Sequence, residues 1–291
     1  MRMKKLNVAT RRGSVLNGVL NGVLFDTPGA DTVLVNITGI HGNFYSNPFY
    51  YDFGAALNSG GFDFVYAQTN DAFGQTPTVN ARTGERELIG SWNERFSYTD
   101  EDIEAYLDWA QDAGYKHVFL SGHSLGANKV MYYLSRYHDG PVEKFMLLSP
   151  ANLSFMMSGV SKREKETVKF YVEQGRGNEM LPFPFMGWVE CIADTAHDWL
   201  FSGYLDNAHT DPAGDFSVAR GVTHSGALLI GTYDNFAGGD PARFLHNVND
   251  HMPTAAQNKM IFIEKTGHTY QMKHRETAEA LLSLMKEWRG N

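Results

Sequence analysis

A serine flanked by small residues is the part of this sequence best suited to chemistry. The segment Gly122-His123-Ser124-Leu125-Gly126 follows an apolar run that ends at Ser121 and precedes a helical pattern. A strand that turns so sharply into a helix needs small residues around the serine, and the turn leaves the serine Oγ exposed. The first amides of the helix, together with its dipole, favour negative charge developing nearby. We therefore predict that Ser124 is a nucleophile; the alternative is an ordinary glycine-flanked turn.

The placement of this serine and the order of the surrounding elements resemble the α/β-hydrolase superfamily over nearly the whole chain. The resemblance implies an α/β fold with a mostly parallel central sheet, helices on both faces and a serine esterase or lipase-like activity. It also implies an oxyanion hole built partly from a loop after an early strand. Ile40-His41-Gly42-Asn43-Phe44 follows the strand ending at Thr38. By resemblance, the oxyanion amides are those of Asn43 and Leu125, with Phe44 as the alternative to Asn43.

A serine hydroxyl needs a base to remove its proton, and the base needs an acid to orient it. Among eleven histidines, His268 follows a late strand and precedes the last helix, which is the position of the base in the resembled family. His274 lies at or just before that helix and is expected to be a surface residue. We expect His41 to be a loop residue rather than the base.

Three acidic residues are candidates for the partner of His268. Asp234 directly follows the strand expected at 227–232, so it should lie at the same edge of the sheet as Ser124 and His268. Asp240, in Gly238-Gly-Asp-Pro, is the main rival, and a turn or helix cap would equally explain it. Glu264 lies at the end of the strand just before His268. We predict Asp234.

Other residues are candidates for contact with substrate. Arg95 could bind a carboxylate, although an ion pair that ties its loop is the favoured interpretation. Trp188, His41 and Phe44 are further candidates. Segments 92–109 and 122–152 also resemble bacterial hydrolases related to fungal siderophore esterases, a resemblance from which we predict no substrate.

The elements that must position these residues alternate along the chain. Strands are expected at 32–38, 62–67, 117–121, 145–149, 227–232 and 259–263, and helices near 47–58, 99–113, 125–134 and at the C-terminus. Asn17-Gly18 and Asn21-Gly22, in the apolar stretch from Val15 to Phe25, are typical of tight turns. Thr99 and Asp102 resemble a capping box. This alternation predicts a parallel sheet between two helical layers.

Residues 151–215 break the alternation. This segment holds many aromatic and Met side chains among charged, Gly and Pro positions, without a strand pattern. We interpret it as an inserted helical cap, with the hydrolase core formed by residues 1–150 and 216–291. Most of the aromatic cluster is expected to be the cap's own small core.

Composition excludes several classes of function. The 25 Lys and Arg against 33 Asp and Glu give a net charge of −8 with no basic stripe, which disfavours a nucleic-acid partner. The single cysteine, Cys191, excludes an internal disulfide and a multi-thiolate metal site. No secretion signal is evident, no apolar run approaches the length of a membrane span, and no nucleotide or metalloprotease motif is present. We expect a cytoplasmic protein without cofactor or metal.

The sequence therefore predicts a cofactor-free serine hydrolase that cleaves a small-molecule carboxylic ester through an acyl-enzyme. Thioester, amide or C–C hydrolysis by the same three residues remains open, as does a receptor with an idle triad. Nothing in the sequence predicts the oligomeric state.

Overall fold

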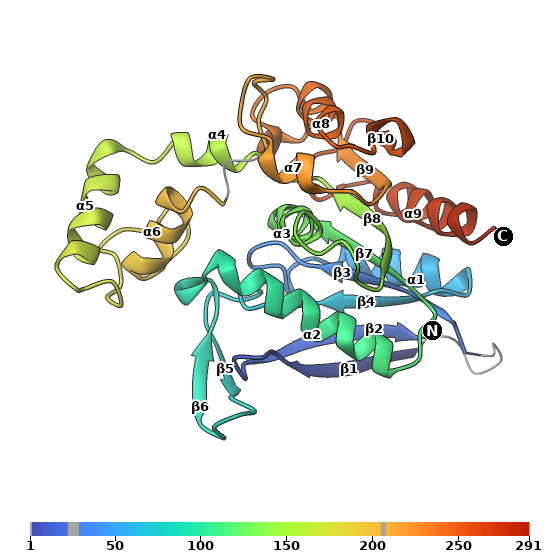
Figure 1. The fold of residues 1–291 in the computed structure, drawn as a ribbon, viewed down its shortest axis with the longest axis horizontal. Coiled ribbons are helices and arrows are strands. Elements are labelled where there is room, and N and C mark those ends of the chain that lie inside the picture. The colour runs from blue at the N-terminus through green and yellow to red at the C-terminus, as the bar shows by residue number, and fades with distance from the viewer. Residues whose placement is uncertain (1, 23–28, 205–207, 291) are drawn as a thin grey trace.

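The structure is a computed structural model that describes residues 2–22, 29–204 and 208–290 (Figure 1). Within these ranges, eight strands form the main sheet in the order β1-β2-β4-β3-β7-β8-β9-β10. The strands are β1 (Arg2–Ala9), β2 (Val15–Gly22), β3 (Thr32–Ile37), β4 (Asp63–Ala67), β7 (His117–His123), β8 (Val142–Leu148), β9 (Gly226–Gly231) and β10 (Lys259–Ile263). The six neighbouring strands β4, β3, β7, β8, β9 and β10 pair in parallel, and β2 is antiparallel to both β1 and β4. The predicted α/β class is confirmed.

Helices cover both faces of the sheet, as expected for parallel strands that are buried on both sides. Alternate residues of β3 show this division: Val33 and Val35 belong to one apolar cluster, and Leu34 belongs to the other. On the first face lie α2 (Thr99–Asp112), α3 (Leu125–Leu134) and α8 (Pro241–Asp250); on the second lie α1 (Phe49–Ser59) and α9 (His274–Arg289). A separate hairpin consists of β5 (Thr76–Val79) and β6 (Arg86–Ile89).

Two local predictions are wrong. Both Asn-Gly pairs lie inside β2, because β2 is paired on both sides and these ladders override the turn preference of the pairs. The turn comes earlier, where Thr10 N–H donates to the Ser14 carbonyl at 3.0 Å. Residues 23–25 of that apolar stretch lie outside the described residues. Thr99 makes no capping bond; Asp102, buried at the same helix start, instead binds Arg12 and the Asn70 amide.

The segment between β8 and β9 forms helices that lie beyond the edge of the sheet (Figure 1). These are α4 (Leu153–Ser158), α5 (Lys162–Glu173) and α6 (Ala193–Phe201). The short α7 (Ser217–Gly221) that follows packs instead against α3 on the first face of the sheet. Phe185, Trp199 and Val168 lie in an apolar cluster that also includes Leu125 of α3. The helices therefore pack partly on one another and partly over the end of β7, where the predicted nucleophile lies.

No helix in the described part of the chain is long and apolar enough to cross a membrane.

Candidate active site

Ser124 lies in the sharp turn between β7 and α3 that the sequence predicted. Its backbone has φ 58° and ψ −128°, a strained conformation for a residue with a side chain. The flanking glycines permit the turn: a Cβ on Gly122 would lie 2.2 Å from the Gly126 carbonyl oxygen, and a Cβ on Gly126 would lie 2.2 Å from the Ile37 carbonyl oxygen. A hydrogen bond to the neighbouring strand β8 also fixes the turn, because the Ser124 N–H donates to the Leu148 carbonyl at 3.0 Å.

His268 and Asp234 form a close pair at the same edge of the sheet. The Asp234 Oδ2 lies 2.9 Å and its Oδ1 3.1 Å from His268 Nδ1. Asp234 is buried, and its Oδ1 also accepts from the Phe236 N–H at 2.9 Å, so the carboxylate is fixed in orientation. A carboxylate only accepts, so Nδ1 carries the hydrogen and Nε2 is left as a free base. Within the described residues His268 Nε2 has no hydrogen-bond partner.

The alternatives to Asp234 have other roles. The Asp240 side chain accepts from the Arg243 N–H at 3.0 Å and caps α8, with Pro241 at the first helical position. Glu264 is exposed at the end of β10. His274 begins α9, where its Nδ1 lies 3.6 Å from Asp52. Of the acidic residues considered from the sequence, Asp234 is the one that contacts His268.

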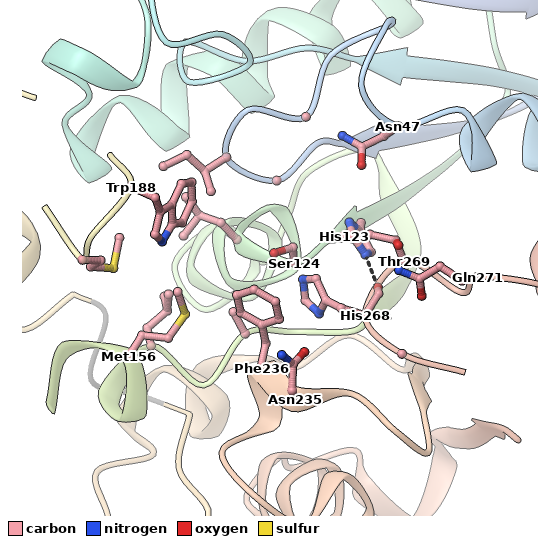
Figure 2. A pocket seen from close by; sticks show the side chains of 18 of the residues that line it. Asn47, His123, Ser124, Met156, Trp188, Asn235, Phe236, His268, Thr269 and Gln271 are labelled. Atoms are coloured by element: carbon pink, nitrogen blue, oxygen red, sulfur yellow. Dashed lines mark hydrogen bonds between the residues drawn. The ribbon is translucent and has the colours of Figure 1, made fainter. Parts of the chain in front are cut away.

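Ser124 and His268 line one cavity of about 340 Å³ (Figure 2). Figure 2 shows Trp188 and Met156 on one side of Ser124, and His268, Thr269 and Gln271 on the other. No hydrogen bond between Ser124 Oγ and His268 occurs in the described residues, and such bonds often tighten only when substrate is bound.

The lining residues are Gly39, Ile40, Gly42, Asn47, His123, Ser124, Leu125, Ala151, Leu153, Met156, Met186, Trp188, Trp199, Asn235, Phe236, Gly267, His268, Thr269 and Gln271. None of these carries a full charge except a protonated histidine.

The loop after β3 approaches Ser124 through Gly39 and Ile40. A Cβ on Gly39 would lie 2.8 Å from the Ser124 Cβ and 3.3 Å from its Oγ, so a larger residue would press on the nucleophile. The Ile40 N–H makes no hydrogen bond within the described residues, and the Leu125 N–H, at the first position of α3, has no acceptor within its helix. Two unpaired amides therefore border the same cavity as Ser124.

The expectation for Asn43 requires correction, because its N–H donates to Ser46 Oγ at 3.3 Å and the residue is absent from the cavity wall. Its side chain instead holds the loop: Nδ2 donates to the His41 carbonyl at 3.2 Å and to the Ala72 carbonyl at 3.0 Å. The Tyr66 hydroxyl donates to the Asn43 carbonyl. The amide of the alternative, Phe44, donates to Gln68 Oε1 at 2.8 Å. The sequence could not fix the register, because which amide faces the serine depends on the path of the loop.

Of the predicted substrate contacts, the structure places only Trp188 in the wall of the cavity. His41 lies behind Trp188, with their rings edge to face and 5.4 Å apart, and its Nε2 lies 2.7 Å from Ser91 Oγ. Burial lowers the pKa of His41, and Asp71 opposes that change. Arg95 is paired with Asp194 at 2.6 Å, as the favoured interpretation expected, and does not reach the cavity. Phe44 also lies outside the cavity.

A buried network of charged groups supports the loop that carries Ile40. Lys129 of α3 is fully buried and lies 2.8 Å from Glu94 Oε1 and 3.1 Å from Asp71 Oδ2. The Asp71 carbonyl accepts from the His41 N–H at 2.8 Å, which connects the network to the loop. Burial raises the pKa of Glu94, and the Lys129 ammonium opposes this rise.

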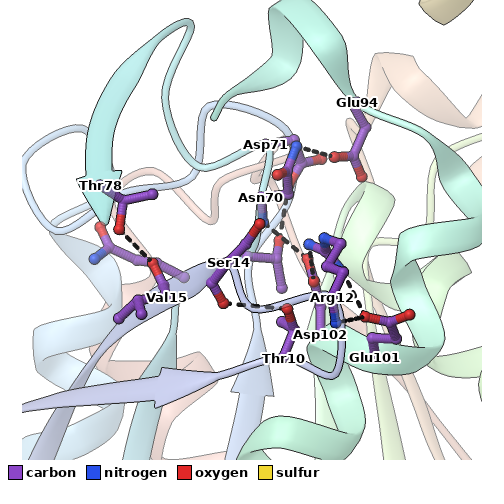
Figure 3. A network of polar contacts seen from close by, with 12 residues as sticks. Thr10, Arg12, Ser14, Val15, Asn70, Asp71, Thr78, Glu94, Glu101 and Asp102 are labelled. Atoms are coloured by element: carbon purple, nitrogen blue, oxygen red, sulfur yellow. Dashed lines mark hydrogen bonds and ion pairs between the residues drawn. The ribbon is translucent and has the colours of Figure 1, made fainter. Parts of the chain in front are cut away.

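The network extends to the start of α2 and to the β1–β2 turn (Figure 3). Asn70 donates from Nδ2 to Glu94 at 2.7 Å and from its N–H to Asp102 at 2.9 Å. Arg12 completes it with a 2.6 Å contact to Asp102. Breaking such a buried pair by removing one partner leaves an uncompensated charge, so the network should resist displacement of the loop.

His123 is a site residue that sequence reasoning missed. It is buried, with 4% of its surface exposed, and its Nε2 lies 2.7 Å from the His268 carbonyl oxygen. Its neighbour Phe236 was also missed as a site residue; that ring lies 4.3 Å from the His268 ring. The available signal was the position of His123 beside Ser124, which fixes it at the same turn.

The described residues contain no group of three or more His, Cys, Asp or Glu side chains that could hold a metal ion.

Comparison with protein-family models identifies the family of the chain. A family model described as the alpha/beta hydrolase family matches residues 39–280. The chain belongs to this family. A search of curated proteins finds no match.

Solved structures of the same fold include esterases. Est1E from Butyrivibrio proteoclasticus is 14% identical with a TM-score of 0.65, and the match covers 99% of each chain. The Pyrococcus furiosus esterase Pf2001 is 15% identical with a TM-score of 0.59, covering 98% of this chain and 92% of that one. An esterase domain from a Rhodothermus marinus protein is 11% identical with a TM-score of 0.62, covering 97% of each chain. At these identities the likeness shows the fold, which together with the family supports a hydrolase.

Proposed function

We propose that this protein is a serine esterase that cleaves uncharged carboxylic esters through an acyl-enzyme intermediate. The observation that carries the proposal is the His268–Asp234 pair, in which the His268 Nε2 has no partner among the described residues and His268 lines the same cavity as a strained, half-buried serine at the end of β7. Strain at a single serine in a cleft is typical of a functional position.

In this proposal His268 Nε2 accepts the proton of Ser124 as Oγ attacks the ester carbonyl. The Asp234 carboxylate holds the imidazole in the required tautomer and stabilises the imidazolium that forms. His268 then gives the proton to the departing alkoxide, and the acyl group stays on Ser124. A water molecule, deprotonated by the same imidazole, attacks the acyl-enzyme and releases the acid.

Negative charge that develops on the carbonyl oxygen requires donors already in place. We assign this role to the amides of Ile40 and Leu125, because both border the cavity and neither has another acceptor among the described residues. Ile40 therefore takes the role that the resemblance assigns to Asn43. Gly39 permits this arrangement, since any Cβ there would contact the serine side chain.

The substrate class follows from the lining of the cavity. Met156, Met186, Trp188 and Trp199 come from the segment between β8 and β9, for which we propose the role of a cap spanning 151–215. These side chains suit an apolar group. No lysine or arginine lines the wall in the described part of the chain, which disfavours a carboxylate or phosphate on the substrate. The cavity of about 340 Å³ limits the enclosed group to a small or medium size.

A fluorophosphonate probe tests the reaction class. We expect labelling of wild type at Ser124 alone, mapped by peptide mass spectrometry, and none in Ser124→Ala. Activity of that variant should fall by about 10³-fold or more, since only the oxyanion hole and binding remain. A label on another serine would refute the proposal.

An ester panel tests the substrate class. The panel should contain p-nitrophenyl esters of graded acyl length and a hydroxycinnamate ester, because one structure of Est1E has ferulic acid bound. We expect neutral apolar acyl groups to be preferred over dicarboxylate half-esters. Faster cleavage of the charged esters would contradict the inference from the cavity wall.

A further inference from the structure

The loop that carries His268 has an unfavourable backbone. It connects β10 to α9, and Lys265, Tyr270 and Met272 have φ values of 57°, 54° and 63°. Side chains with a Cβ rarely adopt this left-handed region, and such residues persist only where the surrounding structure determines the conformation. The loop therefore depends on contacts with the rest of the molecule to keep the His268 ring in place.

Two buried groups from other elements hold this loop. His123 Nε2 lies 2.7 Å from the His268 carbonyl oxygen. Two residues further along the loop, the buried Tyr270 hydroxyl accepts from Ser149 Oγ at 3.1 Å. The His123 contact differs in kind, because it comes from the residue next to Ser124 and ends on the main chain of His268 itself.

The surroundings of His123 leave it little freedom. Its ring lies 5.0 Å from the Phe49 ring, 5.8 Å from Tyr50 and 4.9 Å from His268. A carbonyl oxygen only accepts, so Nε2 of His123 must carry the hydrogen. Burial, and the nearby His268, lower the pKa of His123 to about 3, so the ring stays neutral when His268 is protonated during turnover.

We propose that His123 is a positioning residue that fixes His268 relative to Ser124 by donating a hydrogen bond from Nε2 to the His268 carbonyl. The connection is short: the donor is the residue immediately before the nucleophile, and the acceptor belongs to the base itself. The strained turn at Ser124 and the strained loop at His268 are thereby held as one unit. This inference rests on the proposed function, because it assigns His268 as the base.

The contact should affect the chemical step more than substrate binding. A displacement of about 1 Å between reacting groups can cost about 100-fold in rate. Loss of the donor leaves the part-buried His268 carbonyl without this partner and lets the strained loop relax. The apolar wall of the cavity, formed by Met156 and Trp188, does not depend on this hydrogen bond.

Three variants separate the hydrogen bond from packing. His123→Phe keeps a ring but lacks the donor, whereas His123→Gln places an amide N–H near the position of Nε2. Phe49→Leu is the matched control, because it disturbs the same aromatic cluster without removing the bond. Each is compared with wild type in kcat, KM and second-order rate of fluorophosphonate labelling, with thermal unfolding monitored.

We expect His123→Phe to lose about 10- to 100-fold in kcat and in labelling rate, with KM changed by less than about threefold. His123→Gln should recover most of this loss, and Phe49→Leu should keep kcat within about threefold of wild type. A folded His123→Phe protein that is labelled as fast as wild type would overturn the inference alone. Wild type that is not labelled at all would overturn the proposed function and the inference with it.

A measurement on wild type keeps the test valid if His123→Phe does not fold. Imidazole ¹⁵N chemical shifts of the histidine-labelled protein report which nitrogen bears hydrogen. We expect His123, assigned by comparison with His123→Gln, to be the neutral Nε2–H tautomer at neutral pH and at about pH 5. An Nδ1–H tautomer would show that the bond to the His268 carbonyl is absent and would overturn the inference.

Discussion

His123 should make the folded protein sensitive to acid. Burial lowers its pKa from 6.5 to about 3 in the folded state, with His268 adding to this change and Asp234 opposing it. A folded-state pKa below the unfolded value means that the unfolded chain binds the proton more readily. The stability that comes from keeping this ring neutral is therefore complete above about pH 6.5 and is lost as the pH falls from there toward 3.

The size of this effect follows from the window between the two pKa values. Each pH unit inside the window costs about 1.4 kcal/mol per proton. Lowering the pH from about 7.5 to about 4.5 crosses roughly two units of it, so titration of His123 should lower the unfolding free energy by about 3 kcal/mol. His123→Gln cannot titrate and should lack this loss, so the difference in stability between wild type and variant should shift by that amount in favour of the variant.

Urea unfolding followed by tryptophan fluorescence, at both pH values, measures this difference. Contributions from the other titrating groups cancel when wild type and variant are compared. His246, exposed on α8, is the matched control, and His246→Gln is expected to follow wild type. If wild type and His123→Gln lose stability in parallel within about 0.5 kcal/mol, the burial argument for His123 is refuted.

Three more changes test the site and its support. Asp234→Asn should lower kcat in esterase assays by about 10³-fold or more, whereas Asp240→Asn, which keeps a helix-capping side chain, should stay near wild type. The reverse result would reassign the acid to Asp240. Lys129→Met should lower the unfolding free energy, measured in urea titrations, by about 3–5 kcal/mol because it leaves buried carboxylates unpaired. Lys162→Met, at an exposed ion pair, should change the unfolding free energy little. Equal effects of the two variants would contradict the role of the network. Replacing residues 154–214 with a short Gly/Ser linker should, if the protein still folds, keep fluorophosphonate labelling but abolish discrimination between bulky and acetyl esters. Retained discrimination would place substrate specificity in the loops of the core.

The sequence alone predicted most of the sheet and the residues at its edge. Runs such as 32–38 and 117–121 became β3 and β7 because an apolar stretch bounded by turn residues carries the signal within a few positions. The candidates Ser124, Asp234 and His268 were found because each lies within a few residues after the end of a strand. Parallel strands end at one edge, so chain order was sufficient to predict their proximity.

Local signals failed where distant partners were stronger. The Asn-Gly pairs of β2 favour turns, but hydrogen bonding to β1 and β4 keeps these residues in a strand. Asp102 stands at a capping position, yet Arg12 and Asn70 bind its carboxylate. In each case the competing contact comes from a segment that the local pattern does not include.

The sequence by itself determined the fold class, the sharp turn at Ser124 and the order of the candidate triad, because these depend on neighbours along the chain. Only the tertiary structure decided that Ile40 rather than Asn43 offers a free amide beside Ser124, and that Arg95 is paired with Asp194. It also decided that His123 reaches the His268 carbonyl, a contact across 145 residues. The direction of an amide or a ring depends on the conformation of its loop, which is set by packing against segments distant in sequence. Residue spacing along the chain does not determine that conformation.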